Sequence, residues 1–235
     1  EGELQSAGYV KMTAGALRAF SVRVERTTYG FFIPGGQVYR SPGEIQTEGD
    51  WSGAAFFLGA GALGGPVSCT GLQRDSFQRD RQILDVLARF GAEVSFEGDT
   101  ARVAGGALKG IRIDMADIPD LAPILCAVAA HAQGESVLEN AGRLRLKESD
   151  RLSGCADMVR ALGGEALLQG DDLHIWGREL CGGEVDTRAD HRMVMAAAVA
   201  AAFAAGPSTL SDPESAAKSY PGFFEDYQTC GGIIL

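Results

Sequence analysis

The chain has 235 residues, of which 46% are hydrophobic and 22% charged, so it can bury a substantial core. Its 21 basic and 31 acidic residues give a net charge of −10, which argues against nucleic acid or an anionic membrane as its main partner. The five cysteines lie far apart without a C-x-x-C pair, which favours a reduced cytoplasmic protein. The longest apolar stretch, residues 193–205, is too short to span a bilayer.

The first predicted elements are a helix over residues 10–20 and a hairpin with strands near 22–24 and 29–33. The chain begins at Glu1, only a few residues before this helix. We therefore expect a fragment that starts inside a longer protein.

Three helices rich in alanine and glycine are predicted over residues 52–63, 121–131 and 191–205. They recur at a fixed interval, since Trp51 and Leu121 are 70 positions apart, as are Leu121 and His191. Small residues on nearly every face predict buried helices that pack closely against other backbone. Each is followed by a short predicted strand, near 66–70, 136–139 and 208–210.

An amphipathic helix follows each of these strands, the first ending at Phe90 and the second at Leu162. A hairpin follows each of these two helices, at residues 93–104 and 165–176. Gly91 and Gly163 suit the left-handed position that ends a helix.

The pattern predicts an α/β fold of repeated βαβαββ units. Three units occupy residues 43–235, each expected to open with a strand and the last to end after its second helix; residues 1–42 hold the tail of a preceding unit. A chain with about three and a half copies of the unit is more easily explained as part of a longer array of such units than as a complete one.

Asp50, Asp120 and Asp190 each lie at the predicted N-terminus of a buried helix. Position alone favours helix caps. Helix N-termini also attract anions, and the two basic neighbours His191 and Arg192 exceed what a cap requires. These corners are therefore candidate anion sites.

Residues 143–152 read Arg-Leu-Arg-Leu-Lys-Glu-Ser-Asp-Arg-Leu, before an amphipathic helix that we expect to start near Lys147 or Ser149. Such charges can form a solvated helix face, or a cage for phosphate or carboxylate. Lys218 lies 71 positions after Lys147, so repeated cations favour one shared pocket.

Other binding motifs are missing from the sequence. There is no phosphate-binding loop with a GK[ST] ending and no G-x-G-x-x-G after a strand. His131 and His174 lack metal-ligand spacing and are interpreted as structural. We predict no metal and no other cofactor.

Five segments resemble, in order, the 5-enolpyruvylshikimate-3-phosphate synthase family: residues 48–52 (EGDWS), 117–121 (DIPDL), 143–152, 190–193 (DHRM) and 218–221 (KSYP). The resemblance implies two domains of three βαβαββ units each. This chain would hold the C-terminal domain, residues 43–235, and the end of the N-terminal one, residues 1–42. The missing N-terminal half would be its partner, and the chain alone should be inactive.

The resemblance further implies transfer of the enolpyruvyl group of phosphoenolpyruvate to the 5-hydroxyl of shikimate 3-phosphate, releasing phosphate, in aromatic amino-acid biosynthesis. Asp120 would accept the hydroxyl proton, and Glu148 would be the acid–base residue at the enolpyruvyl carbon, which fits a reaction that needs both an acid and a base. Shikimate 3-phosphate would be bound by Lys147, Ser6, Tyr9 and Arg143. Phosphoenolpyruvate would be bound by Arg151, His191, Arg192 and Lys218.

Two alternatives stay open: enolpyruvyl transfer to a UDP-amino sugar, and a scaffold domain with an unused site. One departure from the family is Gln78-Arg79-Asp80, where relatives usually have Gln-Gly-Asp. We expect this turn to lie away from the cation cluster.

Overall fold

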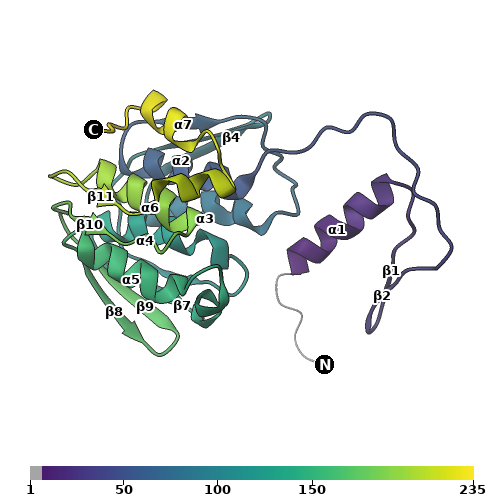
Figure 1. Cartoon of the computed structure of the whole chain (residues 1–235), viewed down its shortest axis with the longest axis horizontal. Coiled ribbons are helices and arrows are strands. Elements are labelled where there is room, and N and C mark those ends of the chain that lie inside the picture. The colour runs from purple at the N-terminus through teal and green to yellow at the C-terminus, as the bar shows by residue number, and fades with distance from the viewer. Residues whose placement is uncertain (1–6) are drawn as a thin grey trace.

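The computed structural model describes residues 7–235. Helix α1 (Ala7–Ala19) and an antiparallel hairpin, β1 (Glu25–Thr27) and β2 (Gly30–Phe32), project from the rest of the chain, which α1 contacts through Tyr9 near its N-terminal end (Figure 1). The helix confirms the prediction, but the first strand begins later than expected. Val22 and Val24 are not in it: they are buried in a small separate core with Ala14 of α1, and the N–H of Val22 donates to the backbone oxygen of Leu17 instead of to a strand.

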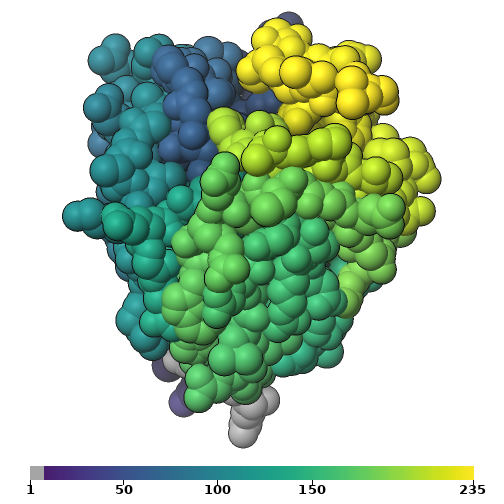
Figure 2. All heavy atoms as spheres, turned by 90° about the vertical axis from the view of Figure 1, so that its left-hand side faces the viewer, coloured from purple at the N-terminus to yellow at the C-terminus, as the bar shows by residue number. Residues whose placement is uncertain are grey.

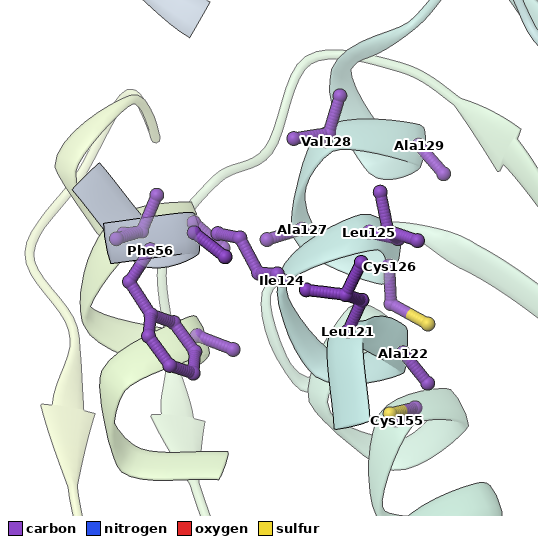
Figure 3. Packing of buried hydrophobic residues seen from close by; sticks show 14 of the residues in the cluster. Phe56, Leu121, Ala122, Ile124, Leu125, Cys126, Ala127, Val128, Ala129 and Cys155 are labelled. Atoms are coloured by element: carbon purple, nitrogen blue, oxygen red, sulfur yellow. The ribbon is translucent and has the colours of Figure 1, made fainter. Parts of the chain in front are cut away.

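Three helices lie at the centre of the larger part: α2 (Trp51–Leu63), α4 (Ala122–His131) and α6 (His191–Ala202). Each contacts the other two, as the small residues predicted. A Cβ on Gly59 would lie 2.6 Å from Cγ1 of Ile124, so glycine allows α2 to approach α4. Residues 122–130 of α4 are buried, and Figure 3 shows hydrophobic side chains of this helix, such as Ile124, within the packed cluster.

Two sheets flank these helices. The first has the order β3-β5-β4, with β3 (Val67–Cys69) antiparallel to β5 (Thr100–Ala104), and β5 antiparallel to β4 (Glu93–Glu97). The second has the order β6-β7-β9-β8, formed by β6 (Arg112–Asp114), β7 (Gly134–Glu139), β9 (Asp172–Gly177) and β8 (Glu165–Gln169). Strands β6 and β7, on either side of α4, are parallel. Strands β10 (Glu184–Val185) and β11 (Thr209–Leu210) are also parallel and flank α6.

The remaining helices follow β3, β7 and β11: α3 (Ile83–Phe90), α5 (Arg151–Ala161) and α7 (Phe223–Thr229). Short 3₁₀ segments precede α3, α4, α5 and α7, namely η1 (Arg79–Gln82), η2 (Pro119–Leu121), η3 (Gly142–Leu146) and η4 (Pro213–Lys218). Gly91 and Gly163 have φ values of 107° and 86°, which confirms their left-handed conformation. Helix α5 starts at Arg151, later than predicted, because the Asp150 side chain caps it by accepting from the N–H of Ser153.

One expected strand is missing. Residues 43–50 form no strand, so the first sheet has no counterpart of β6. The α/β character of the chain is otherwise as predicted. On the molecular face shown in Figure 2, the colours from blue to yellow mark neighbouring surface regions formed by successive parts of the chain. Within residues 7–235, no helix is long and apolar enough to cross a membrane.

Candidate active site

The sequence-predicted residues converge where α2, α4 and α6 begin. Asp50 and Asp190 are helix caps, since their carboxylates accept from the backbone N–H groups of Ser52 and Arg192, at 2.9 and 3.0 Å. Asp120 is different. It lies within η2, and its carboxylate contacts side chains that come from other elements.

Asp120 is surrounded by donors. Its oxygens lie 3.0 Å from Nζ of Lys147, 3.1 Å from Nη1 of Arg151 and 2.9 Å from the Tyr9 hydroxyl, which donates to it. Burial by itself would raise the pKa of Asp120, but Arg192 and Lys147 outweigh it and lower the pKa to about 2. The carboxylate is therefore ionised and pre-oriented at neutral pH.

Arg151 is the hub of the cluster, with a side chain only 1% exposed. Its Nε and Nη2 donate to the two oxygens of Asp190, at 2.8 and 3.1 Å. Nη2 also lies 2.7 Å from Oε2 of Glu148. One guanidinium thus joins three carboxylates, from η2, from the turn before α5 and from the start of α6.

Glu148 lies at the solvent side of this hub, with 40% of its side chain exposed. Burial favours the neutral acid, but a backbone hydrogen bond and Arg151 outweigh it, so the pKa of Glu148 is lowered. Nζ of Lys218, which is itself mostly exposed, lies 3.8 Å from Oε1 of Glu148. The predicted cation before α7 therefore reaches the same site.

Arg192 and His191 come from the first turn of α6. Nη1 of Arg192 donates to the backbone oxygen of Asp120 at 3.0 Å. His191 is buried, and its Nδ1 has no hydrogen-bond partner among the described residues; Oδ1 of Asp190 is 3.7 Å away. Burial, assisted by Arg151 and Arg192, lowers the pKa of His191 despite Asp190, so this imidazole is neutral at pH 7.

The expectation that Gln78-Arg79-Asp80 lies away from the cations was wrong. Asp80 is 4% exposed, accepts from Ser52 Oγ at 2.5 Å and lies 3.7 Å from Nη1 of Arg192. Together with Tyr9, these three residues line part of a cavity of about 240 Å³. The sequence held one signal of this: Asp80-Arg81 precedes the matching pair Asp150-Arg151 by 70 positions.

The two remaining predicted residues are Arg143 and Ser6. Arg143 is an exposed residue of η3, before Lys147 in the chain. Ser6 falls outside the described residues. The two histidines interpreted as structural lie outside this cluster: His131 Nε2 contacts the backbone oxygen of Ala200 at 3.3 Å, and His174 Nδ1 lies 2.8 Å from Glu135.

Known proteins share both sequence and fold with the chain. A relative from Methanopyrus kandleri named 3-phosphoshikimate 1-carboxyvinyltransferase is 40% identical over 98% of this chain and 54% of its own length. One of the same name from Thermococcus kodakarensis is 43% identical over 94% of this chain and 54% of its own. The chain therefore spans about half the length of the curated relatives it matches.

A solved EPSP synthase from Acinetobacter baumannii superimposes with a TM-score of 0.81 and 28% identity, covering 91% of this chain and 52% of its own. The family model described as EPSP synthase (3-phosphoshikimate 1-carboxyvinyltransferase) matches residues 1–227. Because that match takes in nearly the whole chain, the chain belongs to the EPSP synthase family.

Proposed function

We propose that this chain forms one half of an active site that transfers the enolpyruvyl group of phosphoenolpyruvate to the 5-hydroxyl of shikimate 3-phosphate and releases phosphate. The observation that carries the proposal is the pairing of Asp120 and Glu148 on the two terminal nitrogens of Arg151. The reaction needs both a base and an acid, and this guanidinium holds two carboxylates near each other. Family membership and the names of the relatives support the same reaction.

Asp120 is the proposed base for the 5-hydroxyl. A carboxylate with a pKa of about 2 is a weak base, and that low value results from Arg192 and Lys147. When the phosphate of shikimate 3-phosphate takes up the positive charge of Lys147, the pKa of Asp120 rises. Substrate binding thus increases the basicity of the group that must accept the proton.

Glu148 is the proposed acid–base residue at the methylene carbon. In the first step, the hydroxyl oxygen bonds to C2 of phosphoenolpyruvate, Asp120 takes the hydroxyl proton, and Glu148 gives a proton to C3. In the second step, Glu148 removes a proton from the new methyl group, the C2–O bond to phosphate breaks, and the double bond re-forms. Arg151 and Lys218 help to lower the pKa of Glu148, and an anionic substrate beside them offsets their charge, so the pKa of Glu148 rises. More of Glu148 then carries the proton that the first step needs.

The proposed substrate ligands form two groups. We assign Lys147, Arg143, Tyr9 and Ser6 to shikimate 3-phosphate, and Arg192, His191, Arg151 and Lys218 to phosphoenolpyruvate. Arg151 is enclosed by carboxylates, so a substrate carboxylate would reach it by replacing Glu148, the more exposed of its partners. Such an exchange keeps the buried guanidinium paired throughout and frees Glu148 for proton transfer.

The proposed architecture is three βαβαββ units in residues 43–235 and the end of a preceding domain in residues 1–42. The segment β6-α4-β7-α5-β8-β9 has the order of one such unit. The partner in this proposal is an N-terminal half like that of the relatives, which would close the other side of the site.

Two other functions remain as test outcomes: enolpyruvyl transfer to a UDP-amino sugar, and a scaffold without activity. The test mixes this chain with the N-terminal half of the Methanopyrus kandleri relative, verifies their association by gel filtration, and measures phosphate release from phosphoenolpyruvate. Release with shikimate 3-phosphate supports the proposal. Release only with the UDP-amino sugar, or none from an associated pair, contradicts it.

A further inference from the structure

We propose that Asp80 is a positioning residue: together with Ser52 it holds the guanidinium of Arg192 in the orientation that meets an anionic substrate. The inference rests on the proposed function, in which Arg192 binds phosphoenolpyruvate. It adds a residue from η1 and one from α2 to a site otherwise built from Tyr9 of α1 and from residues at or just before the starts of α4, α5, α6 and α7.

The geometry places Asp80 behind Arg192. One carboxylate oxygen, Oδ2, accepts from Ser52 Oγ at 2.5 Å and lies 3.7 Å from Nη1 of Arg192. The second contact is too long for a hydrogen bond, so it is a charge interaction between two largely buried groups. The Arg192 side chain is 14% exposed and that of Asp80 is 6% exposed.

Arg192 is restrained from a second direction by Asp120. Its Nη1 donates to the backbone oxygen of Asp120 at 3.0 Å, and its Nη2 lies 3.8 Å from Oδ2 of the same residue. Asp80 and Asp120 thus bracket the guanidinium. A planar guanidinium fixed in this way can meet an incoming phosphate or carboxylate with a defined fork of N–H groups.

Burying Asp80 is costly, and it does not serve as a helix cap. Burial raises the pKa of Asp80, and the hydrogen bond from Ser52 and the charge of Arg192 oppose that shift. The caps of η1 and α3 are Gln78 and Gln82. A buried carboxylate that is not a cap and faces a substrate-binding arginine points to function.

Positioning can be separated from simple electrostatics because the two effects have opposite signs. A negative charge beside Arg192 repels an anionic substrate, so its removal alone would lower the KM for phosphoenolpyruvate. If the charge instead orients Arg192, its removal raises that KM. Asp80→Asn keeps the size of the side chain and an oxygen for Ser52, but removes the charge.

The experiment uses the two-part mixture described above, with Asp85→Asn as the matched control, since Asp85 is an exposed carboxylate on the adjoining helix α3. We expect Asp80→Asn to raise the KM for phosphoenolpyruvate about tenfold. The KM for shikimate 3-phosphate should change less than about twofold, and Asp85→Asn should resemble the wild type. An unchanged or lowered KM for phosphoenolpyruvate overturns the proposal, as does an equal rise in both KM values.

A second measurement does not depend on turnover. In the chain alone, labelled with ¹⁵N-arginine, the heteronuclear NOE of the Arg192 Nε–Hε group reports its motion. We expect a clear loss of this NOE in Asp80→Asn and none in Asp85→Asn; equal NOE values in all three proteins overturn the proposal. An inactive wild-type mixture would therefore count against the proposed reaction, while the NOE would still decide the role of Asp80.

Discussion

The guanidinium of Arg151 and the carboxylate of Asp190 form a two-point ion pair in which the side chains are 1% and 0% exposed. Ser149 also donates to Asp190, at 3.0 Å. Because Arg151 begins α5 and Asp190 caps α6, the pair joins the starts of two helices. The catalytic carboxylates of the proposed reaction depend on this pair, since Arg151 holds them both.

Asp190→Asn should therefore destabilise the fold. Asparagine can still cap α6, so the substitution mainly removes the buried charge opposite Arg151. Breaking a buried ion pair costs about 3–5 kcal/mol, and the remaining partners of Arg151 place the expected loss near 3 kcal/mol. Urea unfolding measures it. Asp157→Asn removes an exposed charge, since the Asp157 side chain is 54% exposed and pairs with Arg188, and should cost less than about 1 kcal/mol. Equal losses in the two variants would show that the buried pair contributes no more than an exposed one.

Tyr9→Phe should loosen α1 from the rest of the chain. The Tyr9 hydroxyl donates to Asp120, which lies 111 positions later, and so links α1 to η2. A hydrogen bond to a charged group contributes about 1.5–3 kcal/mol, so amide exchange in residues 7–19 should accelerate about tenfold or more. Exchange followed by mass spectrometry tests this. Tyr29→Phe, at a fully exposed tyrosine, is the control; unaltered exchange in Tyr9→Phe would mean that the bond does not dock α1.

Stability should fall as the pH drops from 7.5 to 5.5, in part because of His131. Burial lowers the pKa of His131, although its contact with the Ala200 backbone oxygen opposes the shift. Below about pH 6.5 the unfolded chain therefore binds a proton that the folded chain excludes, so stability decreases with falling pH.

Asp120 and Asp190, two of the carboxylates with lowered pKa values, lose their contribution only at lower pH, below about 3.9. The pKa of Asp80 is raised, so its contribution to stability increases as the pH falls. Comparing wild type with His131→Gln by urea unfolding at both pH values isolates the histidine. The wild type should lose more stability than the variant; equal losses would contradict a buried neutral His131.

Much of the fold could be predicted because it depends on local patterns. Trp51, Leu121 and His191 are spaced 70 residues apart and mark three helices with small residues on nearly every face. These are the central helices α2, α4 and α6. The expected first strand at residues 43–50 failed for a tertiary reason: β3 pairs with β5, and the sheet has no further partner on its other side. Which strands pair depends on residues far apart in the sequence, so the local sequence pattern does not reveal it.

The site was predictable where charge breaks the apolar pattern, as at Asp120 and Lys147. Asp80 was placed wrongly because its flanking polar residues resemble a surface turn. Its burial depends on Ser52, 28 positions earlier, and on Arg192, which is far along the chain. The complete enclosure of Arg151 was likewise hidden, since two of its three carboxylates come from η2 and from the residue that precedes α6.

The most direct test of the central claim asks whether the Asp120 cluster performs the transfer. Phosphate release from phosphoenolpyruvate and shikimate 3-phosphate is measured with both halves, with each half alone, and with Asp120→Ala or Asp117→Ala in this chain. Asp117 is the control because it lies on the same turn, 56% exposed, and pairs with Arg79. We predict release only with both halves, a decrease of about 10²–10⁴-fold in Asp120→Ala, and a change of less than about twofold in Asp117→Ala. Release by Asp120→Ala at the wild-type rate would contradict the account.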